Sequence, residues 1–136
     1  MSTTARWDIV IEQGMPFAQA FAPEYYDRDT DTLKRRDYTG YRATFSLWAS
    51  PATFDSIHDT PAKLTLTSDS GAVELGLFDS TEFGKYGILL YLTPNQTSNL
   101  SPFGRGVYNL DVLDSYGNPQ LRIKGVVTFE EGERHG

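Results

Sequence analysis

The sequence contains no cysteine and only two histidines, His58 and His135, among its 136 residues. The lack of cysteine excludes a disulfide framework, a Cys-based zinc site and a catalytic thiolate. Because His135 is the penultimate residue, where chain ends usually fray, a metal site would have to consist almost entirely of carboxylates. The sequence therefore predicts no cofactor.

Long apolar runs and an excess of positive charge are also missing. The longest unbroken apolar run, Ile88–Leu92, is far shorter than the roughly 20 residues of a membrane-spanning helix. The N-terminal residues lack the apolar core of a signal peptide, which predicts synthesis and folding in a cytoplasm. The formal net charge of −6 argues against a broad basic face, and nearby aspartates offset the basic cluster Lys34–Arg36. We therefore expect neither a membrane nor a nucleic acid as a partner.

Aromatic residues are abundant: 8 tyrosines, 8 phenylalanines and 2 tryptophans make up 13% of the chain. This content is enough to fill the core of one domain, and it favours strands over helices. Alternation of apolar and polar residues is clearest in Tyr38–Trp48, which predicts a half-buried antiparallel strand. Two alternating runs within Gly106–Phe129 flank the turn Tyr116–Pro119 and predict a long β-hairpin, in which Gly125 is expected to mark a bulge.

Five shorter segments also have strand composition: Arg6–Glu12, Met15–Ala22, Lys63–Thr67, Ala72–Phe78 and Gly87–Leu92. With turn residues between the segments, the pattern predicts an all-β fold, an antiparallel β-sandwich of about seven or eight strands with one short helix. We expect a single domain over residues 6–129, between flexible termini at 1–5 and 130–136.

The short helix is predicted directly after the strand that ends at Leu92. Thr93 can cap its first turn, Pro94 suits the first helical position, and Gln96 has the spacing that completes a capping box.

Residues 23–37 are the least regular part of the chain, and we expect a long loop there. Long loops on a rigid scaffold often carry binding contacts, and aromatic and arginine side chains are typical of interfaces. Trp48 is expected on the outward side of its strand. The candidate partner contacts are therefore Tyr25, Tyr26, Arg28, Leu33, Arg35, Arg36 and Trp48. The two tyrosines and the tryptophan are also the residues with which a carbohydrate-binding module would hold a sugar.

A calcium loop is suggested by the spacing of Asp27, Asp29 and Asp31. An EF-hand loop requires Gly at its sixth position and Glu at its twelfth, where this chain has Thr32 and Tyr38. A solvated acidic loop is the simpler interpretation, and calcium binding is left open.

The sequence offers no complete set of catalytic residues. His58–Asp59 could form an acid–base pair, but no nucleophile accompanies it. The carboxylates of Asp111 and Asp114, or of Glu130 and Glu131, could suggest a glycosidase. Adjacent residues of a strand face opposite sides, however, so the carboxylates of Glu130 and Glu131 would diverge. Surface charge that keeps the protein soluble is the simpler explanation of these carboxylates. We therefore expect no enzymatic activity.

Four features follow one another in a recognisable order. They are Gln13–Phe17, the Asp-Tyr-Thr-Gly-Tyr segment that starts at Asp37, Leu90–Leu100, and the paired runs Gly106–Val112 and Leu121–Thr128. This ordered set, which covers most of residues 7–129, resembles a family of small immunoglobulin-like structural proteins of tailed bacteriophages. Two features depart from the family pattern: Asn109 stands where an acidic residue is usual, and residues 23–36 are longer than the family norm.

The resemblance implies an immunoglobulin-like sandwich and a non-enzymatic part of a virion. Such a protein would dock or anchor other virion proteins at the baseplate, the fibre-attachment region or the neck of the tail, in a homo-oligomeric ring or another multi-copy assembly. Within the virion, the alternative is a capsid decoration protein on the head. Outside this class, the alternative is a carbohydrate-binding β-sandwich module.

Overall fold

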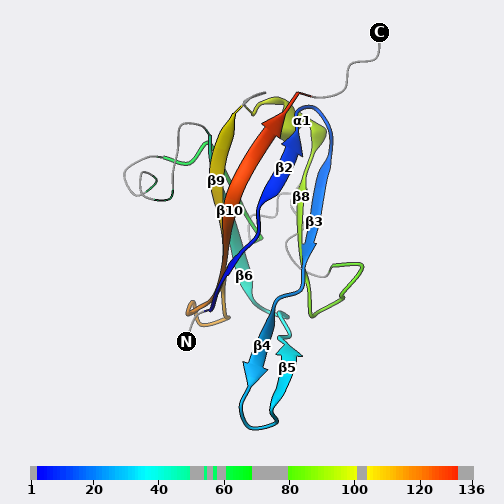
Figure 1. Ribbon diagram of the computed structural model, residues 1–136, viewed down its shortest axis with the longest axis vertical. Coiled ribbons are helices and arrows are strands. Elements are labelled where there is room, and N and C mark those ends of the chain that lie inside the picture. The colour runs from blue at the N-terminus through cyan, green and yellow to red at the C-terminus, as the bar shows by residue number, and fades with distance from the viewer. Residues whose placement is uncertain are drawn as a thin grey trace.

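The computed structural model describes residues 3–49, 54, 57, 61–68, 80–100 and 104–131 (Figure 1). These residues form two layers of strands with one short helix, and a narrow hairpin projects from one end of the layers (Figure 1). The all-β sandwich that the sequence predicts is confirmed, with ten strands in the described residues where about seven or eight were expected.

The larger layer is a six-stranded sheet. Its strands are β1 (Thr3–Arg6), β2 (Ile9–Glu12), β6 (Arg42–Trp48), β7 (Leu64–Thr67), β9 (Arg105–Leu113) and β10 (Pro119–Glu130). Their order is β1-β10-β9-β6-β7, and β2 pairs with β10 on the same edge as β1. The long antiparallel hairpin of β9 and β10 is confirmed. However, β1 and β2 run parallel to β10, so this sheet is mixed rather than purely antiparallel.

The second layer is the antiparallel pair β3 (Phe17–Phe21) and β8 (Ile88–Leu92). Alternate residues of both layers point into a common core, because side chains on a strand face opposite sides in turn. The largest fully buried side chains are Tyr108, Phe45, Ile11, Leu47, Ile88, Leu90, Leu92, Leu110, Ile123, Val112 and Val127. The alternation predicted for residues 38–48 is confirmed, although the strand itself begins only at Arg42.

The short helix α1 (Pro94–Ser98) has the predicted capping box. Thr93 Oγ1 accepts a hydrogen bond from the Gln96 N–H at 3.2 Å, and the Gln96 side chain accepts one from the Thr93 N–H at 2.9 Å. The buried Thr97 hydroxyl donates to the Met15 carbonyl at 2.7 Å, which ties α1 to the turn between β2 and β3.

The single strand predicted over Arg6–Glu12 is wrong: Trp7 and Asp8 separate β1 from β2. The Trp7 N–H still donates to the Lys124 carbonyl at 2.9 Å. At the next position the Asp8 carboxylate, rather than a backbone carbonyl, accepts the Val126 N–H at 2.9 Å. A side chain therefore replaces one bond of the ladder at the edge of the sheet.

Gly125 does not mark a bulge in the long hairpin, as was expected, because it pairs in register with Tyr108. The register shift in this hairpin lies at its other end, between Pro119 and Leu121. Gly125 instead faces the break in the edge strand, where a Cβ atom would stand 2.0 Å from the Trp7 carbonyl oxygen. That same oxygen accepts a hydrogen bond from the buried Tyr108 hydroxyl.

Residues 23–37 are not the irregular loop that was expected. They contain β4 (Glu24–Asp27) and β5 (Thr32–Arg35), which form the antiparallel hairpin that projects from the sandwich (Figure 1). Residues 28–31 make the turn, and Asp31 adopts a left-handed conformation with φ of 54°. Aspartate tolerates this conformation better than most residues with a side chain.

Strand pairing begins at Thr3 and ends at Glu130, so it extends beyond the predicted limits of 6–129 into segments that were expected to be flexible. The predicted strand Ala72–Phe78 lies outside the described residues.

Candidate docking surface

The β4–β5 hairpin has one register, marked by charges of opposite sign on its two strands. Glu24 faces Arg35, with 3.7 Å between the carboxylate and the guanidinium. Asp27 and Lys34 are diagonal neighbours, with 2.9 Å between Oδ2 and Nζ. Exposed pairs of this kind contribute little to stability. They still disfavour a slip by one residue, which would move every side chain to the opposite face.

This register gives the hairpin two different faces. One face carries Glu24, Tyr26, Leu33 and Arg35, and the other carries Tyr25, Asp27, Thr32 and Lys34. On the first face, Tyr26 and Leu33 are directly opposed and remain 55% and 66% exposed. A directly opposed apolar pair stabilises the hairpin and also presents apolar area to solvent.

The apolar pair continues onto the body of the sandwich through Tyr86, which is 41% exposed. A shallow pocket of about 420 Å³ separates the hairpin from this residue and is lined by Glu24, Leu33, Lys34, Arg35 and Tyr86. We call Tyr26, Leu33 and Tyr86 the apolar patch. The sequence analysis missed Tyr86, because nothing in the residues around it indicates that it lies beside the hairpin.

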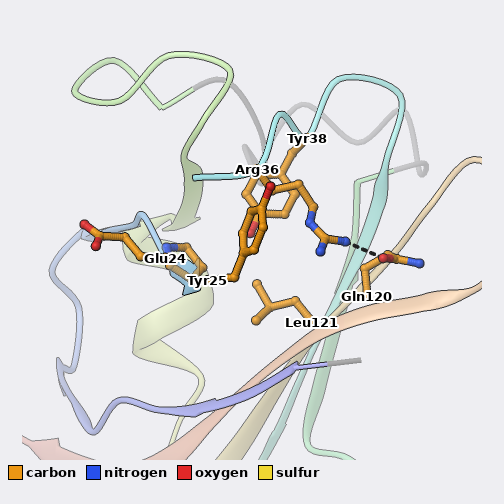
Figure 2. A pocket seen from close by; sticks show the side chains of 7 residues that line it. Glu24, Tyr25, Arg36, Tyr38, Gln120 and Leu121 are labelled. Atoms are coloured by element: carbon orange, nitrogen blue, oxygen red, sulfur yellow. Dashed lines mark hydrogen bonds between the residues drawn. The ribbon is translucent and has the colours of Figure 1, made fainter. Parts of the chain in front are cut away.

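The root of the hairpin is fixed to the large sheet by Arg36. Its guanidinium donates to the side-chain oxygen of Gln120 on β10 and lies 5.4 Å from the centroid of the Tyr25 ring. Figure 2 shows these side chains around a small pocket whose walls also include Tyr38 and Leu121. The cation–π contact and the hydrogen bond both restrain the angle at which the hairpin leaves the sandwich.

The second strand of the hairpin is held by the segment before β8. The Arg35 guanidinium lies 5.0 Å from the centroid of the Phe83 ring, and Lys85 Nζ lies 3.5 Å from Asp37 Oδ2. The N–H of the buried Tyr38 donates to the Lys85 carbonyl at 2.9 Å. The hairpin is therefore anchored on both strands at its root, while its turn projects away from the sandwich (Figure 1).

The seven candidate contact residues do not form one site. Tyr25 and Tyr26 lie on β4, Leu33 and Arg35 on β5, Arg28 in the turn between them, and Arg36 directly after β5. Arg36 and Tyr25 contribute to anchoring the root, so Tyr26 and Leu33 are the most available of the apolar members. Trp48 lies apart from all of them, on β6, where it lines a different pocket.

The acidic residues of the hairpin turn serve local structure. Asp27 pairs with Lys34 and accepts the Asp29 N–H at 2.9 Å, while Asp31 accepts the Tyr26 hydroxyl. The residues that the structure describes contain no group of three or more His, Asp or Glu side chains able to hold a metal ion.

The carboxylates that could have suggested a glycosidase, Asp111 and Asp114, make structural contacts. Asp111 pairs with Arg122 on the outer face of the sheet, and Asp114 accepts backbone N–H groups in the β9–β10 turn. The pair His58–Asp59 lies outside the described residues.

The contacts within the hairpin shift the pKa values of Asp27, Lys34 and Tyr26. The hydrogen bond from Lys34 lowers the pKa of Asp27, and the same contact raises the pKa of Lys34. The hydrogen bond to Asp31 raises the pKa of the Tyr26 hydroxyl. These shifts move the pKa of each of the three groups further from neutrality, so the Asp27–Lys34 ion pair and the Tyr26 hydroxyl keep their protonation states near pH 7.

No family model matches the sequence, and no curated protein is significantly similar to it. No helix among the residues that the structure describes has the length and apolar character needed to cross a membrane.

Proposed function

We propose that the protein is a non-enzymatic docking component of a tailed-bacteriophage virion, and that its β4–β5 hairpin binds a neighbouring virion protein. The observation that carries the proposal is the hairpin itself, which is anchored at its root and exposes Tyr26 and Leu33 on one face. A two-stranded hairpin buries little of its own surface and is only marginally stable alone. Its exposed apolar pair and fixed register suit contact with a partner rather than a role in the core.

The resemblance of the ordered sequence motifs to immunoglobulin-like tail proteins supports the virion class, with the tail as the favoured location. A symmetric, multi-copy assembly fits the small size of the apolar patch, because repeated weak contacts add up to stable attachment.

A sugar platform built from the two hairpin tyrosines is disfavoured by the register. Tyr25 and Tyr26 are neighbours on β4 and therefore point to opposite faces, so their rings cannot lie side by side against one sugar chain. This geometry favours a protein partner for the hairpin.

Mass spectrometry of purified virions tests the class of protein. The chain should be present at a fixed stoichiometry relative to a major virion protein, and its absence from intact particles would refute the proposal. Cross-linking within the particle then identifies the neighbour. Cross-links to tail proteins support the favoured location, whereas cross-links to the major capsid protein would overturn it in favour of head decoration.

The role of the hairpin is tested with the double variant Tyr26→Ser, Leu33→Ser, supplied in trans to particles that lack the native chain. We expect at least a tenfold loss of incorporation, equivalent to about 1.4 kcal/mol. The matched control is Val10→Ser, because Val10 is 52% exposed on β2 and pairs with Thr128, at the end of β10 opposite to Gln120, to which the hairpin is anchored. Normal incorporation of the double variant, with its thermal midpoint unchanged, would show that the hairpin is not the docking element.

A further inference from the structure

The face of the large sheet that points away from β3 and β8 carries a second candidate site, unrelated to the hairpin. Leu110 and Ile123 are buried in the core, and successive side chains of a strand face opposite sides. Asn109 and Asp111, together with the residues paired with them on β6 and β10, therefore point to the outer face. Two rows of polar residues therefore cross the face. One row is Ser46, Asn109 and Lys124, and the other is Thr44, Asp111 and Arg122.

Asn109 is the informative member of these rows. Asn109 is 8% exposed, and no described residue forms a hydrogen bond with its side-chain amide. Among the described residues no buried side-chain polar atom lacks a partner, so the amide atoms of Asn109 still reach solvent. Asn109 lies in the wall of a pocket of about 430 Å³, so its donor and acceptor are available to a molecule in that pocket. This volume is within the range of about 300–1,000 Å³ that is typical of small-molecule sites.

The charges of the described residues that line the pocket leave one cation in excess. Asp111 and Arg122 neutralise each other through a 2.5 Å contact between Oδ1 and Nε. The ammonium group of Lys124 has no carboxylate partner among the described residues, and it lies 5.1 Å from the centroid of the Phe54 ring. The pocket therefore suits a ligand that combines uncharged polar groups with one negative charge.

An aromatic wall completes the pocket. Trp48 lines one side, half-buried, at the end of β6. Its backbone lies so close to β9 that a Cβ atom at Gly106 would stand 2.0 Å from the Trp48 carbonyl oxygen. This close approach, which only glycine allows, holds the tryptophan against the polar rows.

We propose that this pocket binds an acidic saccharide, a sugar that carries one carboxylate. The amide of Asn109 and the Asp111–Arg122 pair offer donors and acceptors to sugar hydroxyls, which are themselves both donors and acceptors. Lys124 attracts the carboxylate, and the aromatic side of the pocket accepts the apolar C–H face of the sugar ring. The inference does not depend on the virion proposal, because a different face of the sandwich carries it.

The test is an NMR titration of the ¹⁵N-labelled full chain with sodium glucuronate as the probe. Glucose serves as the neutral match and acetate as the acid without a sugar ring. We expect saturable shifts of the Asn109 side-chain NH₂ and the Trp48 indole signals with glucuronate, at least fivefold weaker binding of glucose, and no site-specific shift with acetate. Equal responses to acetate and glucuronate would show an adventitious ion only and would overturn the proposal, as would the absence of saturation with both sugars.

Variants separate the contributions to this site. Lys124→Gln should weaken glucuronate binding at least fivefold and leave glucose binding unchanged. The matched control Lys85→Gln, which lies in the segment before β8 and pairs with Asp37, should change neither. Asn109→Ala should weaken both sugars. If Asn109→Ala reduces folding, Asn109→Ser keeps a small polar group and should bind with intermediate affinity. Unchanged sugar affinities in Lys124→Gln and in the folded Asn109 variant would refute the assignment.

Discussion

Replacing Gly125 with alanine should detach the edge strand β1 from the sheet. The new Cβ would stand 2.0 Å from the Trp7 carbonyl oxygen, 2.6 Å from its carbon and 3.0 Å from Tyr108 Cε1. Because the first two atoms belong to the backbone, no rotation of a side chain relieves the clash. The φ angle of Gly125 is not in the positive range, so alanine introduces no backbone strain of its own.

Two effects set the size of the expected loss in the free energy of unfolding. Forcing an extra carbon into a packed site costs typically about 1–3 kcal/mol. Displacement of Trp7 also breaks the hydrogen bond from the Tyr108 hydroxyl, which adds roughly 0.5–1.5 kcal/mol. We therefore expect the free energy of unfolding to fall by about 2–4 kcal/mol. For a chain of this size, each kcal/mol lowers the thermal midpoint by roughly 4 °C.

Guanidinium denaturation followed by tryptophan fluorescence measures the loss, and amide hydrogen exchange locates it. In Gly125→Ala, the amides of Thr3–Arg6 should lose protection before those of β9. The control Gly117→Ala introduces strain at a φ of 84° in open space, so it should cost about 1 kcal/mol without exposing β1. A Gly125→Ala variant within 0.5 kcal/mol of the native chain, with β1 still protected, would refute the reasoning.

Two further predictions concern pH. Hydrogen bonds from the backbone of the β9–β10 turn lower the pKa of Asp114, so it stabilises the fold above its unfolded pKa of about 3.9, and this contribution disappears at lower pH. Asp114→Asn should therefore lose less stability than the native chain between pH 4 and pH 2, as denaturation midpoints would show; parallel curves would contradict this. Burial raises the pKa of Tyr38 to about 12, so the unfolded chain loses this proton first and stability should fall from about pH 10 towards pH 12. Tyr38→Phe should flatten that decline in thermal melts, and an unchanged slope would argue against the assignment.

The parts of the fold that were predicted correctly are those that neighbouring residues specify. Thr93 and Gln96 are three positions apart and make the capping box by themselves. The β9–β10 hairpin likewise has its turn and both alternating runs within one continuous segment. The break at Trp7–Asp8 depends instead on Gly125, which follows more than a hundred positions later, and no local pattern indicates it.

The hairpin at residues 24–35 was missed for a different reason. Both of its faces are exposed to solvent, so burial imposes no apolar alternation on its strands. Of the aspartates whose spacing suggested a calcium loop, Asp27 ends β4, whereas Asp29 and Asp31 lie in the turn. The carboxylates of Asp27 and Asp31 accept hydrogen bonds from within the hairpin. Six of the seven candidate contact residues were still brought together there, because the segment was recognised as one that the core does not require.

The pocket beside Trp48 could not have been predicted from the sequence. Its walls come from β6, β9 and β10, and the position of Asn109 between Ser46 and Lys124 is visible only once these strands are aligned.

The interruption between β1 and β2 has a consequence for how molecules of this protein behave at high concentration. An uninterrupted edge strand would offer a continuous row of backbone donors and acceptors to another chain. Here Asp8 turns its carboxylate onto the Val126 N–H and pairs with Arg6 at 3.2 Å, so charge and a kink divide the edge into two pieces of four residues each. Short, interrupted edges of this kind are poorer templates for a strand of another chain. At high protein concentration, the break at Trp7 and Asp8 therefore disfavours polymerisation along the edge that β1 and β2 form.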